Sequence, residues 1–313
     1  MALFPHQSIK AQNERERFLI DLFDNLWERY RGRMEYVRKY EELIQAHGAS
    51  FTNDHIAFRT LAAQRPPAGI FTISRVFEAL GYASAGCYEF PDKHFNSIHY
   101  QHRAPGFPKL FITQLKTWEL PPAARRVMDK SLQAHRPPLG DDVLRALWDL
   151  PRVSKKRRAA LLKTLTRFFQ ELPWPLPQKK DVLALNRHTQ FGAWVLVNGY
   201  DVNHFTALVD SHRVPALDDI EKTAQAMRRA GIPMKKEIEG ARGSKLRQTS
   251  TEAALIATPV AEGRRKSSMP WAYAYFEIAQ RPLLPGRAER FEGFLGGQAT
   301  RLFEMTRLRK KPK

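Results

Sequence analysis

The chain has 313 residues, of which 43% are hydrophobic and 11% aromatic, and it carries a formal net charge of +19 at pH 7. This composition is typical of a folded protein with one large domain or two modules, and it excludes a disordered chain. No stretch approaches the ~20 consecutive apolar residues that a membrane-spanning helix needs, and the first ten residues lack the apolar centre of a secretory signal, so we expect a cytoplasmic protein without a membrane span.

The N-terminal part of the chain, residues 1–50, predicts a helical cap on the core. Within it, residues 14–46 repeat apolar side chains at helical spacing, which indicates one or two amphipathic helices. The apolar positions are Phe18, Leu19, Leu22, Phe23, Leu26, Trp27 and Tyr30.

Residues 51–118 predict a first module that reads strand, helix and then three strands. The first strand contains His55 and Arg59, and the helix is expected to end at Gly81. The expected elements are a strand at 55–59, a helix at 73–80 and strands around 87–90, 97–102 and 109–115.

The same order of elements returns in residues 185–313, which we interpret as a second module with C-terminal helices and a basic tail. Its expected elements are a strand at 202–208, a helix at 217–230 that ends at Gly231, and strands near 236–238, 246–256 and 272–279. The two first strands also share a short motif, DHI at 54–56 against NHF at 203–205. Two βαβββ modules around a metal cleft form the vicinal-oxygen-chelate architecture, so the sequence predicts an α+β fold of this type.

Residues 119–184, between the modules, predict a helical insertion. The segments 141–149 and 153–172 have helical apolar spacing, and prolines interrupt the region repeatedly. We expect the insertion to pack over the core or to form a lid, and nothing in its sequence indicates a catalytic role.

Two of the ten histidines, His55 and His204, occupy the same place in the first strand of each module. A single histidine in a strand is more often structural. The prediction of a shared ligand role therefore depends on the matched positions of the two histidines. If a pseudo-twofold axis relates the modules, the two side chains approach one cleft from opposite sides. With Cys87 as the only cysteine, any metal must be held by histidine and carboxylate ligands, which favours iron, manganese or catalytic zinc.

Glu277 is the candidate for a third ligand, because it is the sole carboxylate in an apolar run at 275–279. A buried carboxylate is costly unless it is paired or bound to a metal. One alternative is that Glu277 pairs with Arg281, which lies on the same strand face. Two histidines and a carboxylate form the facial triad of non-haem Fe(II) oxygenases, which leaves open positions for substrate and O2.

In five ordered motifs the chain resembles the 2-oxoadipate dioxygenase/decarboxylase family. The matching stretches are NDHIAFRT (53–60), FPKLFI (107–112), GYDVNHFT (199–206), LRQTST (246–251) and YFEIAQR (275–281). The resemblance implies a vicinal-oxygen-chelate-like fold and Fe(II) held by His55, His204 and Glu277. It also implies that Arg59 is a catalytic residue that binds a substrate carboxylate.

The reaction that the resemblance implies joins a small 2-oxo acid with O2 and releases CO2, and for 2-oxoadipate the product is 2-hydroxyglutarate. No separate 2-oxoglutarate or nicotinamide is needed, because the substrate supplies its own electrons. Arg59 also has a plainer explanation as a surface or interface salt bridge. Gln248 and Ser250 alternate on one face of an expected strand, where they either line the substrate pocket or satisfy neighbouring backbone groups.

Two other classes of function remain open. The same architecture supports metal-dependent lyases, isomerases and hydrolases. The strong positive charge, with local runs at 155–158 and 307–313, is the electrostatic feature of a nucleic-acid-binding protein. The charge is spread along the chain, however, and we find no nucleic-acid-binding motif and no glycine-rich phosphate loop, which makes nucleic acid the less favoured partner.

Overall fold

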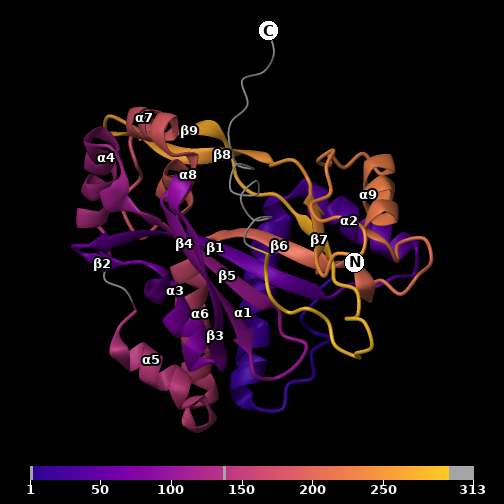
Figure 1. Cartoon of the computed structure of the whole chain (residues 1–313). Coiled ribbons are helices and arrows are strands. Elements are labelled where there is room, and N and C mark those ends of the chain that lie inside the picture. The colour runs from indigo at the N-terminus through magenta and orange to yellow at the C-terminus, as the bar shows by residue number, and fades with distance from the viewer. Residues whose placement is uncertain (1–2, 137–138, 296–313) are drawn as a thin grey trace.

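The computed structural model describes residues 3–136 and 139–295, and a curled mixed sheet forms the centre of the fold (Figure 1). The strands are β1 (Asn53–Gln64), β2 (Pro67–Ala68), β3 (Tyr82–Phe90), β4 (Phe95–His102), β5 (Lys109–Lys116), β6 (Val202–Leu208), β7 (Arg247–Ser250), β8 (Leu255–Glu262), β9 (Arg265–Ala272) and β10 (Glu277–Gln280). The helices are α1 (Glu14–Arg33), α2 (Glu35–Ala46), α3 (Ile70–Ala79), α4 (Pro122–Gln133), α5 (Asp141–Trp148), α6 (Lys155–Gln170), α7 (Lys179–His188), α8 (Gln190–Asn198) and α9 (Ile220–Arg229). The main sheet has the order β3-β4-β5-β1-β6-β10-β7, with β2 beside β1, and β8 and β9 form a separate two-stranded sheet.

The first half of the main sheet has the predicted strand, helix and three-strand order. β1 pairs in parallel with β5, and β4 and β3 continue the sheet in antiparallel pairs. Helix α3 connects β1 and β2 to β3, and Gly81 follows it with a φ of 110°. This left-handed conformation suits glycine, which has no Cβ to clash with the preceding turn.

The second half repeats this connectivity in a shorter form. β6 pairs in antiparallel fashion with β1, β10 lies parallel to β6, and β7 lies antiparallel to β10. Helix α9 follows β6 as predicted. The β1–β6 pair is therefore the junction between the two related halves, and the paired-module α+β fold is confirmed.

Three expected strands of the second half differ from the structure. Residues 236–238 form no strand. Met234 is bridged to Thr251 and Glu239 to Gln248, and between these bridges the segment that contains 236–238 has two more residues than the facing segment of β7. The extra residues form a bulge that breaks the ladder of hydrogen bonds. The expected strand at 246–256 is divided between β7 and the start of β8. The strand expected at 272–279 is divided in the same way, because β9 ends at Ala272 and β10 begins only at Glu277. The β8–β9 hairpin that separates them was not predicted.

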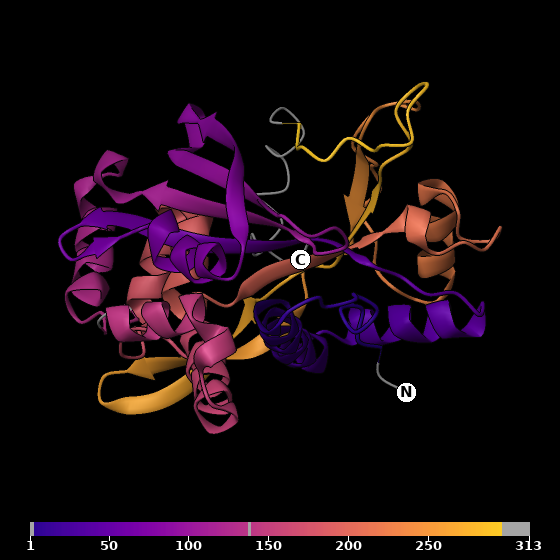
Figure 2. The same ribbon diagram turned by 90° about the horizontal axis from the view of Figure 1, so that it is seen from below.

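The N-terminal helices pack aromatic side chains against one face of the sheet. The ring of Trp27 lies 5.0 Å from that of Phe205, and the Tyr30 hydroxyl donates a hydrogen bond of 2.5 Å to the carbonyl of Tyr275. Figure 2 shows these indigo helices along one side of the strands. Because side chains alternate along a strand, burial of Phe205 on this face directs its neighbour His204 to the other face.

Residues 119–184, which we expected to form a helical insertion, contain α4, α5, α6 and the start of α7, and helices continue beyond residue 184. Helix α7 crosses residue 184, and α8 follows it up to the start of β6. We expected C-terminal helices, and residues 281–295 contain none. The rest of that expectation, residues 296–313 with the basic run at 307–313, lies outside the described residues. Across the described ranges, the structure contains no helix that is both long and apolar enough to cross a membrane.

Candidate metal centre

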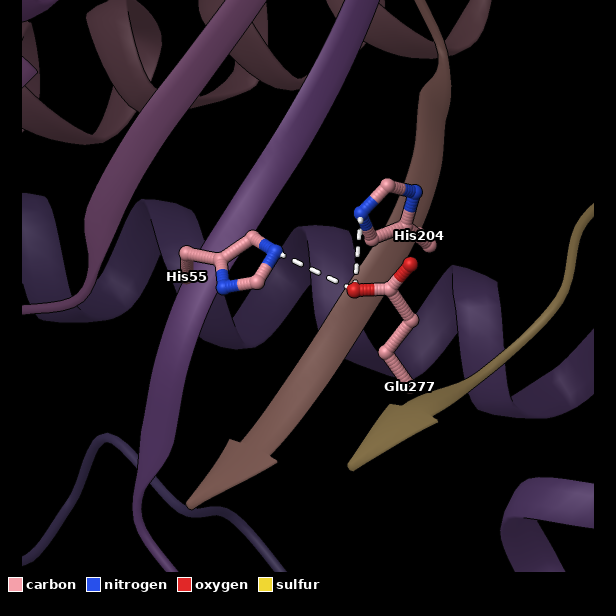
Figure 3. A group of neighbouring side chains, drawn as sticks. All are labelled: His55, His204 and Glu277. Atoms are coloured by element: carbon pink, nitrogen blue, oxygen red, sulfur yellow. Dashed lines mark ion pairs between the residues drawn. The ribbon is translucent and has the colours of Figure 1, made fainter. Parts of the chain in front are cut away.

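Three side chains from three neighbouring strands meet at the centre of the sheet. His55 on β1, His204 on β6 and Glu277 on β10 each present one ligand atom, and these atoms all lie within 4.8 Å of one another. Glu277 Oε2 lies 3.3 Å from Nε2 of His55 and 3.6 Å from Nε2 of His204. Figure 3 shows both imidazoles turned toward this carboxylate. The structure thus brings the three residues proposed from the sequence into one buried cluster.

Strand register explains why these residues converge. Ala57 lies opposite His204 in the β1–β6 pair, while Thr206 lies opposite both His55 on β1 and Glu277 on β10. The Thr206 hydroxyl consequently stands between them, 3.0 Å from Nε2 of His55 and 3.3 Å from Oε2 of Glu277. The register of these strands is strongly specified, because a slip of one residue would turn the side chains of the cluster to the other face of the sheet, into the apolar layer under α1.

Asp54 fixes the far side of the His55 ring. Nδ1 of His55 lies 2.8 Å from Oδ2 of Asp54. The same carboxylate accepts two hydrogen bonds from Arg281, one of 2.7 Å at Oδ1 and one of 3.1 Å at Oδ2. A carboxylate that accepts the Nδ1 proton favours the tautomer in which Nε2 carries the free lone pair. Burial acts to raise the pKa of Asp54, but the charges of Arg281 and Lys109 and the His55 contact hold it well below its ordinary value.

His204 is oriented in a similar way by Asn203 and Tyr275. Its Nδ1 lies 3.1 Å from Oδ1 of Asn203, so that Nδ1 donates and Nε2 faces Glu277. Its ring stacks on that of Tyr275, with the centroids 4.6 Å apart. Burial lowers the pKa of His204 to about 3, against the opposing effect of Glu277, which leaves a neutral imidazole at neutral pH.

Glu277 has the chemistry of a metal ligand in this setting. Within the described residues its Oε1 is buried without a hydrogen-bond partner, and its alternative partner from the sequence, Arg281, binds Asp54 instead. Burial acts to raise the pKa of Glu277, but its electrostatic interaction with His204 and its hydrogen bond with His55 lower the pKa overall, so the carboxylate is ionised at neutral pH. A buried, incompletely paired carboxylate is costly, and a cation between the three side chains would supply the missing partner.

The donor set fits a divalent metal ion. Two neutral imidazoles and one carboxylate form the facial triad of non-haem Fe(II) enzymes, and catalytic zinc sites use the same residue types. The strand of the first half that corresponds to β10 is β5, which carries Phe111 and Thr113 near this position and no carboxylate. The cluster therefore offers three ligands and leaves coordination positions for other molecules.

A cavity opens beside the three side chains. Its empty volume, including its mouth, is about 510 Å³. Its walls are mainly apolar, with a few polar groups. They are formed by His55, Ala57, Phe58, Arg59, Phe111, Thr113, Asn203, His204, Leu246, Gln248, Tyr275, Phe294 and Leu295. Apolar walls with a few convergent polar groups are typical of a small-molecule site.

Arg59 supplies the positive charge on the cavity wall. Its guanidinium carbon lies 4.9 Å from the ring centre of Phe191 and 5.4 Å from that of Trp194, and Tyr275 accepts a hydrogen bond from it. Burial lowers the pKa of Arg59 to about 10, so it remains charged at neutral pH. Because only 3% of the residue is exposed, the alternative of a surface residue does not hold.

The two polar residues of β7 differ in their relation to the cavity. Gln248 lines the wall, and its Oε1 has no hydrogen-bond partner among the described residues. Ser250 is fully buried opposite Glu277 and is absent from the wall. The structure thus offers Gln248, rather than Ser250, a direct contact with a molecule in the cavity.

Several wall residues were missed by the sequence analysis. Tyr275 lies two residues before Glu277, so strand alternation was a signal that it shares the same side of the chain. Phe294 and Leu295 follow the last strand and carried no such signal, because a loop has no periodicity that predicts where it folds back.

A curled sheet of two related halves with a His-His-Glu cluster at their junction defines a vicinal-oxygen-chelate type of protein with a candidate metal centre. The sequence model of the 2-oxoadipate dioxygenase/decarboxylase family matches residues 23–306. The chain therefore belongs to this family, as the ordered motifs indicated.

Two sequence relatives carry the name of this family. The chain is 25% identical over 316 residues to the chloroplastic/amyloplastic 2-oxoadipate dioxygenase/decarboxylase of Oryza sativa subsp. japonica, covering 93% of this chain and 79% of the relative. It is 28% identical over 278 residues to the chloroplastic enzyme of Arabidopsis thaliana, covering 81% and 67%.

Two solved structures share the fold. The hydroxyglutarate synthase of Oryza sativa in complex with 2-oxoadipate has a TM-score of 0.77 and 23% identity, over 95% of this chain and 94% of that one. A glyoxalase superfamily protein from Ralstonia eutropha JMP134 has a TM-score of 0.79 and 22% identity, over 90% and 87%.

Proposed function

We propose that this protein is an Fe(II)-dependent dioxygenase and decarboxylase that converts 2-oxoadipate and O2 to 2-hydroxyglutarate and CO2. The single observation that carries the proposal is the convergence of His55, His204 and Glu277 beside a cavity with Arg59 on its wall, in a chain of this family. The names of the relatives from rice and Arabidopsis supply the substrate. The reaction balances, because both atoms of O2 enter the products and the oxidised carboxyl carbon leaves as CO2.

The charges of the site support a dicarboxylic 2-oxo acid. A divalent cation carries two positive charges, which Glu277 reduces to one and Arg59 restores to two. The two carboxylates of 2-oxoadipate neutralise this total without leaving an unpaired buried charge. A monocarboxylic 2-oxo acid would leave one positive charge without a partner.

Each part of the site has a role in this proposal. Bound Fe(II) would supply the redox chemistry with O2 and a Lewis-acidic point for the 2-oxo acid. Arg59 binds a substrate carboxylate through its planar fork and orients the molecule along the cavity. The apolar wall residues Phe58, Phe111 and Leu246 exclude water and therefore strengthen the contacts of charged groups inside.

A direct experiment measures O2 uptake and CO2 release by the protein with Fe(II) and a panel of 2-oxo acids of different length. We expect turnover to be highest with a dicarboxylic 2-oxo acid and to vanish in His204→Ala and Glu277→Ala. His47→Ala removes an exposed histidine of the N-terminal region and serves as the matched control, with unchanged turnover. Unchanged turnover in the two ligand variants would refute the assigned ligands.

The donor set also supports a second candidate, a zinc-dependent lyase or hydrolase, because two histidines and a glutamate also bind catalytic zinc. Metal analysis of the purified protein separates the two functions when it is combined with assays in the absence of O2. Copurified zinc and activity that does not depend on O2 would favour this second function.

A further inference from the structure

Arg281 connects the candidate ligand His55 to a loop that closes the cavity. The residue is 1% exposed. Its Nε and Nη2 donate hydrogen bonds of 2.7 and 3.1 Å to Asp54, which contacts Nδ1 of His55 at 2.8 Å. Its Nη1 donates hydrogen bonds of 2.7 Å to the carbonyl of Phe291 and of 2.8 Å to that of Gly293. The guanidinium of Arg281 therefore contacts both Asp54, which orients His55, and the backbone carbonyls of Phe291 and Gly293.

We call residues 291–295 the strap, because they fold back from the last strand over the cavity. Phe294 and Leu295 of the strap line the cavity. The ring of Phe294 stands edge-on to that of His55, with centroids 4.9 Å apart, and lies 4.8 Å from the ring of Phe111. The guanidinium carbon of Arg281 lies 5.2 Å from the centre of the Phe294 ring. The strap thus covers the side of the cavity next to the candidate metal centre.

A second ion pair links the strap to the same carboxylate. Glu292 of the strap pairs with Lys109, and Nζ of Lys109 lies 3.5 Å from Oδ1 of Asp54. Two cations, Lys109 on β5 and Arg281 just after β10, therefore hold the strap and Asp54 together. Asp54 is buried between them and needs both a donor and a counter-charge.

We propose that Arg281 is a positioning residue that couples the orientation of His55 to closure of the cavity by the strap. It acts through Asp54 on one side and through the Phe291 and Gly293 carbonyls on the other. The planar fork of arginine makes both sets of contacts at fixed angles, which the single ammonium of a lysine does not reproduce. Closure of the strap and binding of metal at His55 consequently favour each other, as linkage between two sites requires. This inference rests on the proposed metal centre.

The experiment uses Co(II) as the probe ion under anaerobic conditions. One readout is the Co(II) affinity in competition with a chelator, and the other is hydrogen exchange of the backbone amides in the strap with and without Co(II). We expect Co(II) to slow exchange in the strap of the unaltered protein. We expect Arg281→Lys to weaken Co(II) binding by about 10- to 100-fold, the usual effect of losing a group that supports a ligand. In this variant, exchange in the strap should be fast with or without Co(II).

The matched control is Arg31→Lys. Arg31 makes the same kind of forked contact with the buried carboxylate of Glu41, at 3.0 and 2.7 Å, but within the N-terminal helices. This variant should keep both the Co(II) affinity and the Co(II)-dependent protection of the strap. A purely structural role of Arg281 would lower thermal stability in both variants without separating their metal affinities.

Further variants keep the inference distinct from the proposed function. Asp54→Asn keeps the side-chain shape and removes the charge, and it should weaken Co(II) binding even if Arg281→Lys fails to fold. If Glu277→Ala abolishes Co(II) binding while Arg281→Lys and Asp54→Asn leave it unchanged, the coupling is wrong and the metal centre stands. If the unaltered protein binds no Co(II), the proposed metal centre fails and the coupling fails with it.

Discussion

The imidazole of His204 stacks on the phenol ring of Tyr275, with centroids 4.6 Å apart and planes 29° apart, while the Tyr275 hydroxyl accepts a hydrogen bond from Arg59. One side chain therefore contacts a candidate metal ligand through its face and the candidate substrate-binding residue through its edge. The two contacts can be separated by substitution, because only the second needs the hydroxyl.

Tyr275→Phe keeps the stacked ring and removes the hydroxyl. We expect metal affinity to stay within about threefold of the unaltered protein, because an aromatic pair depends on the ring and not on the hydroxyl. The KM for the 2-oxo acid should rise by roughly 5- to 10-fold, which corresponds to the loss of one hydrogen bond of about 1 kcal/mol at Arg59. Steady-state kinetics and chelator competition measure the two effects. A loss of metal binding without a change in KM would contradict this division of roles.

Arg59→Lys tests the substrate-binding role of the arginine. The lysine keeps a charge, but it lacks the planar fork that binds a carboxylate through two hydrogen bonds. We expect kcat/KM to fall by about 10- to 100-fold, the equivalent of one charge-assisted hydrogen bond. Arg247→Lys is a suitable control, because Arg247 pairs with Glu221 away from the cavity wall. Equal effects in both variants would show that stability, and not substrate binding, explains the loss.

Gln248 and Ser250 are expected to differ although both lie on β7. Gln248→Leu removes a polar group from the cavity wall and should raise the KM for the 2-oxo acid by about 5- to 10-fold, as expected for one lost hydrogen bond. Ser250→Ala removes a buried hydroxyl without a hydrogen-bond partner among the described residues, so KM and thermal stability should hardly change. The comparison fails if Ser250→Ala raises KM as much as Gln248→Leu does.

Metal binding should release a proton from His55. Burial acts to lower the pKa of His55, but hydrogen bonds to Asp54 and Glu277 raise it above 6.5 in the metal-free protein. A metal binds the neutral imidazole, so the apparent affinity should fall as the pH falls through this pKa. Co(II) titrations between about pH 6 and pH 8, in buffers of different ionisation enthalpy, measure both the affinity and the released protons. Affinity that is constant over this range would contradict the assignment.

The raised pKa of His55 also makes the stability of the metal-free protein depend on pH, and the contribution of His55 to this stability is greater at low pH, where metal affinity is weaker. Because the folded-state pKa is raised, protonated His55 stabilises the metal-free protein fully below the ordinary pKa of 6.5, and this contribution is lost as the pH rises through the raised value. Urea unfolding of the metal-free protein at several pH values measures this loss, and His55→Gln should abolish it.

The main features of the fold could be predicted from the sequence because each depends on local periodicity. Alternating strands and the glycine after α3 indicated the first half, and the repeat of a histidine in β1 and β6 indicated the second. The predictions were wrong where pairing between distant segments determines the structure. The bulge opposite β7 and the β8–β9 hairpin depend on pairing partners that no single segment reveals.

The candidate site was predictable where it depends on positions in strands, and not where it depends on side-chain pairing. His55, His204 and Glu277 are adjacent because β1, β6 and β10 are neighbours, and their strand positions carried that information. The pairing of Arg281 with Asp54 joins residues on β1 and beyond β10, and it could not be distinguished in the sequence from a pairing with Glu277. The roles of the three residues as metal ligands stay a prediction until a metal is measured.

The position of the cluster at the β1–β6 junction has a consequence for how sequences of this fold can vary. All three side chains belong to three adjacent strands, while the helices between β5 and β6 and the β8–β9 hairpin contribute no side chain to the His-His-Glu cluster. Insertions or deletions in those helices and in the hairpin leave the spacing of the three strands intact. Chains of very different length can therefore keep the same His-His-Glu cluster, as long as the pairing of β1, β6 and β10 is preserved.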